Sequence, residues 1–138
     1  MSALYTAHAH VTGGRNGHGK TDDGLLEVNL AVPKAMGGAG GATNPEQLFA
    51  IGYAACFEGA LQLVARRAKA TLQDASINSS VSLLPQGEGF KLGVALEVLT
   101  KGVDQATAEQ LVAAAHQVCP YSNAVRGNID VALSVKAS

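Results

Sequence analysis

The hydrophobic pattern changes its period along the chain, and it begins with two short alternating runs. Apolar and polar residues alternate loosely over residues 4–11 and more clearly over 25–32, where Pro33 ends the run. Alternation with a period of two is typical of half-buried strands. A glycine-rich segment, 13–17, separates the runs. We therefore expect a hairpin with a glycine-rich connection, followed by a flexible loop over the glycines of 37–41.

A strong helix signal follows this loop. Asn44 can act as the N-cap, Pro45 suits the first helical position, and Gln47 completes a capping box. We expect this helix to run to about Lys69. Its sequence is nearly apolar on every side until Glu58, so it should lie in a core rather than on a surface.

The second half of the chain repeats the change of period. Residues 81–84 and 92–99 predict a second hairpin, Asp104 can cap a helix over 105–118, and 128–135 alternates as a final strand. The predicted order is two strands, helix, two strands, helix, strand. Hairpin-like pairs favour antiparallel sheets and an α+β class.

Length and composition limit the possible functions. A chain of 138 residues is expected to form one domain over residues 1–138, with a sizeable core. The net charge is −1 with mixed acids and bases, which gives no electrostatic case for nucleic acid or an anionic membrane. Charged residues make up 15% of the chain, against about 25% in an average soluble domain. This low charge suggests that part of the surface is buried in an oligomer.

The chain also lacks a visible signal peptide and a membrane span at the level of sequence. The longest uncharged apolar stretch, 47–57, is too short to cross a bilayer. Two cysteines without a secretory signal argue for the cytoplasm, where a disulfide is usually transient and catalytic.

One familiar motif is present and is rejected. Residues 14–21 match the phosphate-binding pattern G-x-x-x-x-G-K-[ST] letter for letter. That chemistry needs the loop to open a helix, so that backbone N–H groups face the phosphates. Here Thr21 is followed by an Asp-Asp-Gly turn and a strand-like run, so we interpret the match as chance. Nucleotide binding is the weakest of the functional hypotheses.

The two cysteines are the main chemical candidates. Cys56 lies about three turns into the first predicted helix, where the helix dipole has faded and burial would raise the thiol pKa. Most such cysteines are inert small hydrophobes, so reactivity requires a cation from elsewhere. Gly52 and Gly59, one turn to either side, leave room beside the sulfur for a ligand or for another backbone. Cys119 lies where the second helix should stop, before Pro120, and could reach the first thiol.

Four arginines are candidates for that cation. Arg66 and Arg67 lie about three turns beyond Cys56 on the same predicted helix, too far to contact it. Arg15, in the glycine-rich connection, and Arg126, near Cys119, remain as alternatives.

With these motifs in view, the chain resembles the OsmC/Ohr family, and within it the organic hydroperoxide resistance (Ohr) branch. The resemblance covers nearly the whole chain, and the Cys119-Pro-Tyr-Ser-Asn motif is closer to Ohr than to OsmC. Val125 and Glu58 depart from the pattern we expect of relatives. The matching segments are residues 4–7, 13–15, 43–50, 52–57, 113–124 and 126–131.

The resemblance implies a thiol peroxidase that reduces organic hydroperoxides, alkyl or lipid, to alcohols. Cys56 matches the peroxidatic cysteine and Cys119 the resolving one; Arg15 matches the arginine that holds the thiolate and Glu46 the carboxylate that positions it. The implied cycle passes through a sulfenic acid on Cys56 and a Cys56–Cys119 disulfide, which a lipoyl-type dithiol, either dihydrolipoamide or a lipoylated protein, resets. No bound cofactor or metal is needed.

The resemblance also implies an OsmC-like fold, with antiparallel sheets wrapped around central helices in an intertwined homodimer. Helix geometry gives a separate reason to expect a dimer. Glu46 and Cys56 are ten residues apart on one predicted helix, which corresponds to about 15 Å of rise and to different faces. If both serve one active site, Glu46 must come from another subunit.

Two other hypotheses remain at this stage. A non-enzymatic member of the same fold could sense redox state through the same disulfide or bind apolar ligands. A Cys/His metal site can also be drawn from His8, His10 and His116, but the spacing matches no strong zinc pattern. Ordinary surface or partly buried histidines are the simpler interpretation.

Overall fold

The computed structural model describes all of residues 1–138. The chain forms two compact units, Met1–Leu48 and Phe49–Ser138. The single-domain assignment therefore stays a prediction.

The first unit holds a small antiparallel sheet in the order β1-β2-β3. Its strands are β1 (Ala9–Thr12), β2 (His18–Thr21) and β3 (Glu27–Asn29). The expected two-strand hairpin is wrong here, because β2 lies between the two predicted strands and pairs with both. β2 reads His-Gly-Lys-Thr, without large apolar residues, so its sequence resembles a connection rather than a strand.

The motif resembling a phosphate-binding loop has a different structure. Gly19, Lys20 and Thr21 lie in β2, and a turn follows them before β3 begins. No helix starts after Thr21, as the sequence predicted, so the backbone cannot form the helix N-terminus that phosphate binding requires.

The long helix α1 (Pro45–Arg67) starts where the sequence predicted and ends two residues earlier than expected. Asn44 caps it, since its Oδ1 accepts the Gln47 N–H at 2.9 Å. The capping box is not reciprocal, because the Gln47 side chain instead accepts the Thr43 hydroxyl at 2.7 Å. A short 3-10 turn, η2 (Lys34–Met36), lies between β3 and this start.

α1 is longer and more apolar than the uncharged stretch alone suggested. It has 23 residues and a window of mean hydropathy 1.6, enough by length and composition to cross a membrane. The core helix of a soluble protein has the same properties, and the inner face of α1 packs through Tyr53, Phe57 and Leu61 into the core of the second unit. Its outer face keeps Ile51 70% exposed.

The end of α1 places a lysine in left-handed backbone. Lys69 has a φ of 55°, its N–H bonds to the Arg66 carbonyl, and the Ala70 N–H bonds to the Ala65 carbonyl. This is a Schellman C-cap, in which the left-handed position is usually glycine because a Cβ is disfavoured there.

Replacement of Lys69 by glycine should therefore stabilise the protein. Glycine removes the free-energy cost of left-handed backbone at this position, and this gain exceeds the cost of the extra entropy that glycine gives the unfolded chain. We therefore expect the free energy of unfolding to rise by about 0.5–1 kcal/mol. Urea denaturation at one fixed protein concentration measures it. Lys69→Ala, which removes the charge but keeps the Cβ, is the control. Equal stability of the two variants would contradict the argument.

The second unit is built on a three-stranded sheet in the order β4-β5-β6. β4 (Asp74–Gln86) and β5 (Gly89–Lys101) form the predicted second hairpin, with longer strands than expected. β6 (Val131–Ala137) pairs with β5 in parallel, so this sheet is mixed rather than antiparallel throughout. The parallel pairing follows from the helical crossover between β5 and β6.

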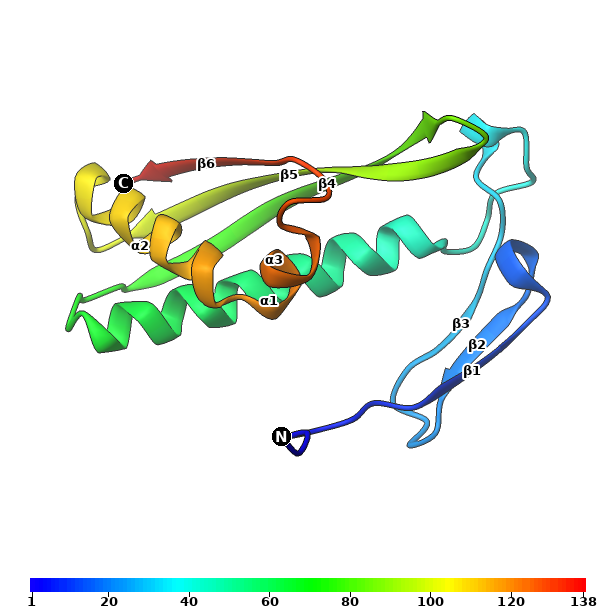
Figure 1. Cartoon of the computed structure of the whole chain (residues 1–138), viewed down its shortest axis with the longest axis horizontal. Coiled ribbons are helices and arrows are strands. Elements are labelled where there is room, and N and C mark those ends of the chain that lie inside the picture. The colour runs from blue at the N-terminus through cyan, green and yellow to red at the C-terminus, as the bar shows by residue number, and fades with distance from the viewer. The chain divides into compact units, whose positions relative to one another are not determined.

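Two helices form that crossover. α2 (Gln105–Val118) matches the prediction, and Asp104 caps it by accepting the Thr107 N–H at 2.8 Å. The short α3 (Pro120–Val125) was not predicted; it begins at the proline that ends α2. Figure 1 shows α1 and α2 on one face of the sheet, where alternate residues of β5 are buried against them. These β5 residues are Val94, Leu96 and Val98.

Candidate active site

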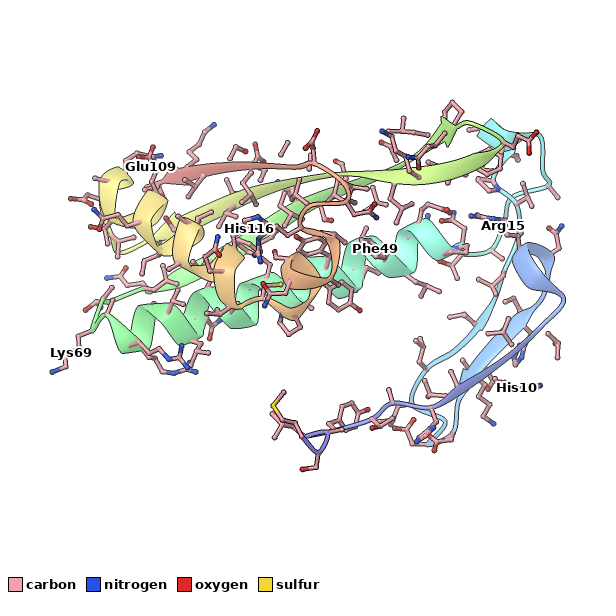
Figure 2. The ribbon with its side chains drawn as sticks, viewed as in Figure 1. His10, Arg15, Phe49, Lys69, Glu109 and His116 are labelled. Atoms are coloured by element: carbon pink, nitrogen blue, oxygen red, sulfur yellow. The ribbon has the colours of Figure 1, made fainter.

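The first unit contains a charged pair, Arg15 and Glu46. The Arg15 Nη1 donates to Glu46 Oε2 at 2.9 Å, and Nη2 donates to Oε1 at 2.7 Å. The side chain of Arg15 is 36% exposed and that of Glu46 is 14% exposed. A bidentate pair fixes the plane of the guanidinium as well as its position. Arg15 is labelled in Figure 2.

The backbone around Arg15 holds it in a tight turn. Arg15 lies in η1 (Gly14–Asn16), and the Asn16 Oδ1 accepts the Val32 N–H at 3.1 Å. The Gly17 carbonyl accepts the Leu30 N–H at 2.8 Å. A Cβ at Gly17 would lie 1.7 Å from the Thr12 carbonyl oxygen, so only glycine fits this turn.

The segment that follows β3 also reaches the start of α1. The Ala31 N–H donates to the Thr43 carbonyl and the Thr43 N–H donates to the Asn29 carbonyl. Together with the Leu30–Gly17 bond, they hold the turn that carries Arg15 close to the start of α1, where Glu46 lies.

Each member of the pair stabilises the charge of the other. Hydrogen bonding to Arg15 holds the pKa of the Glu46 carboxyl below its usual value, against a smaller opposing effect of burial. The hydrogen bond from Arg15 to Glu46 likewise raises the pKa of the guanidinium. Both groups are therefore charged at neutral pH.

The second unit brings the two thiols together. Cys119, at the corner between α2 and α3, has its Sγ 3.4 Å from the Sγ of Cys56 on α1, and both are free thiols. The sequence predicted that Cys56 would be the buried thiol. In the structure Cys119 is fully buried and Cys56 is only partly buried, so Cys56 is the thiol that a small molecule can reach.

The Cys56 thiol is not activated by its own unit. Burial raises its pKa most, the backbone N–H of Tyr121 lowers it, and the adjacent Cys119 raises it further. The net direction is upward, so no net activation comes from these neighbours. This agrees with the sequence argument that reactivity requires a cation brought from elsewhere.

Three aromatic rings pack against one another near the thiol pair. Tyr121 packs at centroid distances of 5.7 Å from both Phe49 and Tyr53. A Cβ at Gly52 would lie 2.8 Å from the Tyr121 hydroxyl oxygen, so the space beside Gly52 is filled by this ring rather than by a ligand. The space beside Gly59 is open within its own chain.

An apolar hollow lies beside these rings. It has a volume of about 310 Å³ and lies next to the corner that carries Cys119. Its lining residues are Phe49, Pro120, Tyr121, Ala124 and Val125. Figure 2 labels Phe49 on α1.

The rival arginine, Arg126, is committed to other partners. Its Nη1 donates to the Asn123 Oδ1 at 2.7 Å, and its Nη2 donates to the carbonyl oxygen of His116 in the last turn of α2. Arg126 thus satisfies a terminal helix carbonyl. It is absent from the groups that shift the Cys56 pKa.

Sequence reasoning missed a chain of side-chain hydrogen bonds that is buried at Tyr53 and Ser122 and partly buried at His116. Ser122 Oγ lies 2.7 Å from the Tyr53 hydroxyl and 2.8 Å from the Nδ1 of His116, which Figure 2 labels. Burial raises the pKa of Tyr53, while burial and then the Arg126 charge lower the pKa of His116, so both side chains are neutral at neutral pH. The only available signal was a serine three residues after Cys119 and a histidine three residues before it.

His116 therefore has a role other than the metal site that can be drawn from the sequence. No group of three or more His, Cys, Asp or Glu side chains is placed to hold a metal ion. His8 and His10 are exposed at and near β1 in the other unit.

The four predicted site residues thus form two pairs. The Arg15–Glu46 pair lies in the first unit and the Cys56–Cys119 pair in the second. That the pairs meet in one active site stays a prediction.

Comparison with known proteins adds to this geometry. The family model described as OsmC-like protein matches residues 38–134. An organic hydroperoxide resistance protein of Xanthomonas axonopodis pv. citri is 53% identical, covering 96% of this chain and 94% of the relative. The OhrB protein of Bacillus subtilis, also named an organic hydroperoxide resistance protein, is 49% identical, covering 97% of this chain and 99% of the relative.

Solved structures agree with the sequence comparison. A crystal structure of an organic hydroperoxide resistance protein from Legionella pneumophila matches with a TM-score of 0.95 and 60% identity, covering 98% of this chain and 99% of that one. This match confirms the predicted α+β, OsmC-like fold. The chain therefore belongs to the OsmC-like family, in its organic hydroperoxide resistance branch.

Proposed function

We propose that this protein is a cysteine-based peroxidase that reduces organic hydroperoxides to alcohols. The observation that carries the proposal is the pair of free thiols 3.4 Å apart, one accessible and one fully buried. Relatives that are about half identical over nearly the whole chain are named organic hydroperoxide resistance proteins. Two adjacent thiols can undergo a two-electron cycle without a bound cofactor.

The first step needs Cys56 as a thiolate. Its pKa is raised within its own unit, and Arg15 is the cation we assign to lower it, since Glu46 fixes the guanidinium. The thiolate sulfur attacks the terminal oxygen of the hydroperoxide and the O–O bond breaks. The alkoxide takes a proton and leaves as the alcohol. Cys56 becomes a sulfenic acid, oxidised by two electrons.

The second step uses the buried thiol. The Cys119 sulfur attacks the sulfenic sulfur of Cys56, the S–O bond breaks, and water leaves with the thiol proton. The sulfurs need to approach from 3.4 Å to a bonded distance of about 2.05 Å. Such a short movement favours the disulfide over further oxidation of Cys56.

The third step returns both thiols by exchange with an external dithiol. A dithiol of the dihydrolipoyl type forms a mixed disulfide with one sulfur and closes on itself, releasing Cys56 and Cys119 reduced. Such a cycle needs a reducing compartment, so a cytoplasmic location is part of the proposal.

A homodimer would complete the site. Glu46 and Cys56 lie ten residues apart on α1, or about 15 Å along its axis. A Glu46 that serves the Cys56 thiol therefore belongs to another copy of the chain. The exposed Ile51 and the open space beside Gly59 on α1 support an interface between copies at this helix.

The apolar hollow beside Tyr121 supports a preference for substrates with an alkyl or aryl group. Apolar walls bind the organic part of a hydroperoxide by burial, and hydrogen peroxide has no such part.

Hydroperoxide consumption with a dihydrolipoamide-regenerating system tests the proposal. We expect repeated turnover, with kcat/KM for cumene hydroperoxide at least about tenfold higher than for hydrogen peroxide, because apolar burial contributes a kcal/mol or more. A protein that reacts once and does not turn over with any dithiol would be a sensor instead. No consumption of either peroxide would reject the proposal.

A further inference from the structure

The hydrogen-bonded chain of Tyr53, Ser122 and His116 lies close in sequence to the two cysteines. Tyr53 lies three residues before Cys56 on α1. His116 lies three residues before Cys119 on α2, and Ser122 lies three residues after it on α3. Tyr53 and Cys56, three apart on one helix, lie on nearly the same face, whereas Cys119 is the extended residue that joins α2 to α3. The hydrogen bonds therefore join the three helical segments next to the sulfur atoms.

Because Tyr53 and Ser122 are buried, their hydrogen bonds hold the side chains in fixed positions. Tyr53 and Ser122 have no exposed surface, so no water replaces a lost partner without opening the core. The Ser122 hydroxyl has one proton and two lone pairs, enough to join the Tyr53 hydroxyl and the His116 Nδ1 at once. The corner that carries Cys119 is thus tied to the turn of α1 that carries Cys56.

The same corner presents a second group to Cys56. The backbone N–H of Tyr121, the residue before Ser122, lowers the pKa of the Cys56 thiol. A shift of α3 would move this N–H and the Cys119 sulfur together.

We propose that Ser122, with Tyr53 and His116, is a positioning device that holds Cys119 against Cys56 and so sets how readily the two thiols form a disulfide. Under the proposed function, on which this consequence rests, it also decides the fate of the Cys56 sulfenic acid. Attack by Cys119 gives the disulfide and water. Attack by the sulfenic sulfur on a second hydroperoxide gives a sulfinic acid and an alcohol, and it is irreversible in the absence of a dedicated reductase.

The first test needs no peroxide and does not depend on the proposed function. The protein is equilibrated with reduced and oxidised glutathione, and the dithiol and disulfide forms are quantified after acid quenching and alkylation. Ser122→Ala should lower the equilibrium constant for the intramolecular disulfide by about tenfold, because it removes both buried hydrogen bonds that favour the close approach of the two sulfurs. Tyr53→Phe removes one hydrogen bond, keeps the ring, and should lower the constant by a smaller factor.

Val98→Ala is the matched control, because it destabilises the core on β5 without touching the chain of hydrogen bonds. It should reduce Tm but keep the wild-type constant. A wild-type constant in both Ser122→Ala and Tyr53→Phe, or an equal fall in Val98→Ala, would overturn the proposal. Tyr53→Phe decides the matter if Ser122→Ala does not fold.

The second test applies if the wild-type protein consumes hydroperoxide. With excess cumene hydroperoxide, the fraction of Cys56 converted to sulfinic acid per turnover is measured by mass spectrometry. This fraction should rise about tenfold in Ser122→Ala, in parallel with the fall in the equilibrium constant for the intramolecular disulfide. It should stay unchanged in Val98→Ala. A wild-type protein without peroxidase activity would reject the proposed function and leave the glutathione result to decide the positioning role.

Discussion

Replacement of Cys56 by serine is expected to abolish the consumption of hydroperoxide. The hydroxyl differs from the thiol by one atom and packs in the same partly buried place, but it is not oxidised to a sulfenic acid. Loss of a covalent nucleophile removes the chemical step itself, so kcat/KM for cumene hydroperoxide should fall at least about 10³-fold. Stopped-flow oxidation under anaerobic conditions measures it. Full activity in this variant would place the chemistry elsewhere.

Cys119→Ser is the matched control, since it removes the other thiol. This variant should still oxidise Cys56 once and release one equivalent of alcohol. It should then accumulate sulfenic and sulfinic acid, because the only thiol within 3.4 Å is gone. Repeated turnover at the wild-type rate in Cys119→Ser, with a dithiol present, would show that Cys119 has no part in the cycle.

The parts of the fold that were predicted from sequence are those with strong local signals. The cap at Asn44, the cap at Asp104 and the alternation of β5 each specify an element through neighbouring residues alone, and each was found as expected. β2 was missed because a strand of small and polar residues has no periodic signal of its own. It pairs with β1 across the tight turn at Gly17 and with β3 across the turn that follows Thr21.

The site shows the same division between local and long-range information. Motifs identified the four residues, but the sequence predicted burial for Cys56, which is only partly buried, and did not predict the full burial of Cys119. The run around Cys56 is apolar, yet one side of α1 faces outward. Cys119 is next to a helix-ending proline, yet it is fully buried in the hydrophobic core of its unit. Burial depends on packing between distant segments, which periodicity along one helix does not determine. The link from Tyr53 to Ser122 spans 69 positions of sequence and has no local signature.

Removal of the Arg15 side chain is the second large effect that we expect. The pKa of the Cys56 thiol is raised by burial within its unit, so without a cation the thiol is protonated at neutral pH. An adjacent positive charge shifts a pKa by about 1–3 units toward the charged form. If Arg15 supplies that charge, Arg15→Ala should move the midpoint of the pH–rate profile of Cys56 oxidation upward by that amount. At pH 7 the rate should fall by about 10- to 10³-fold, and at high pH most of the loss should be recovered because the thiolate then forms without assistance.

Two further variants separate the charge from its position. Glu46→Gln keeps the size of the side chain but weakens the bidentate bond to Arg15, so the profile should move in the same direction by a smaller amount. Lys20→Ala removes one exposed positive charge from the same unit, outside the pair, and should leave the profile in place. An upward shift of equal size in Lys20→Ala would mean that only the net charge matters. An unchanged profile in Arg15→Ala would transfer the role to another cation, with Arg126 the first to test by the same measurement.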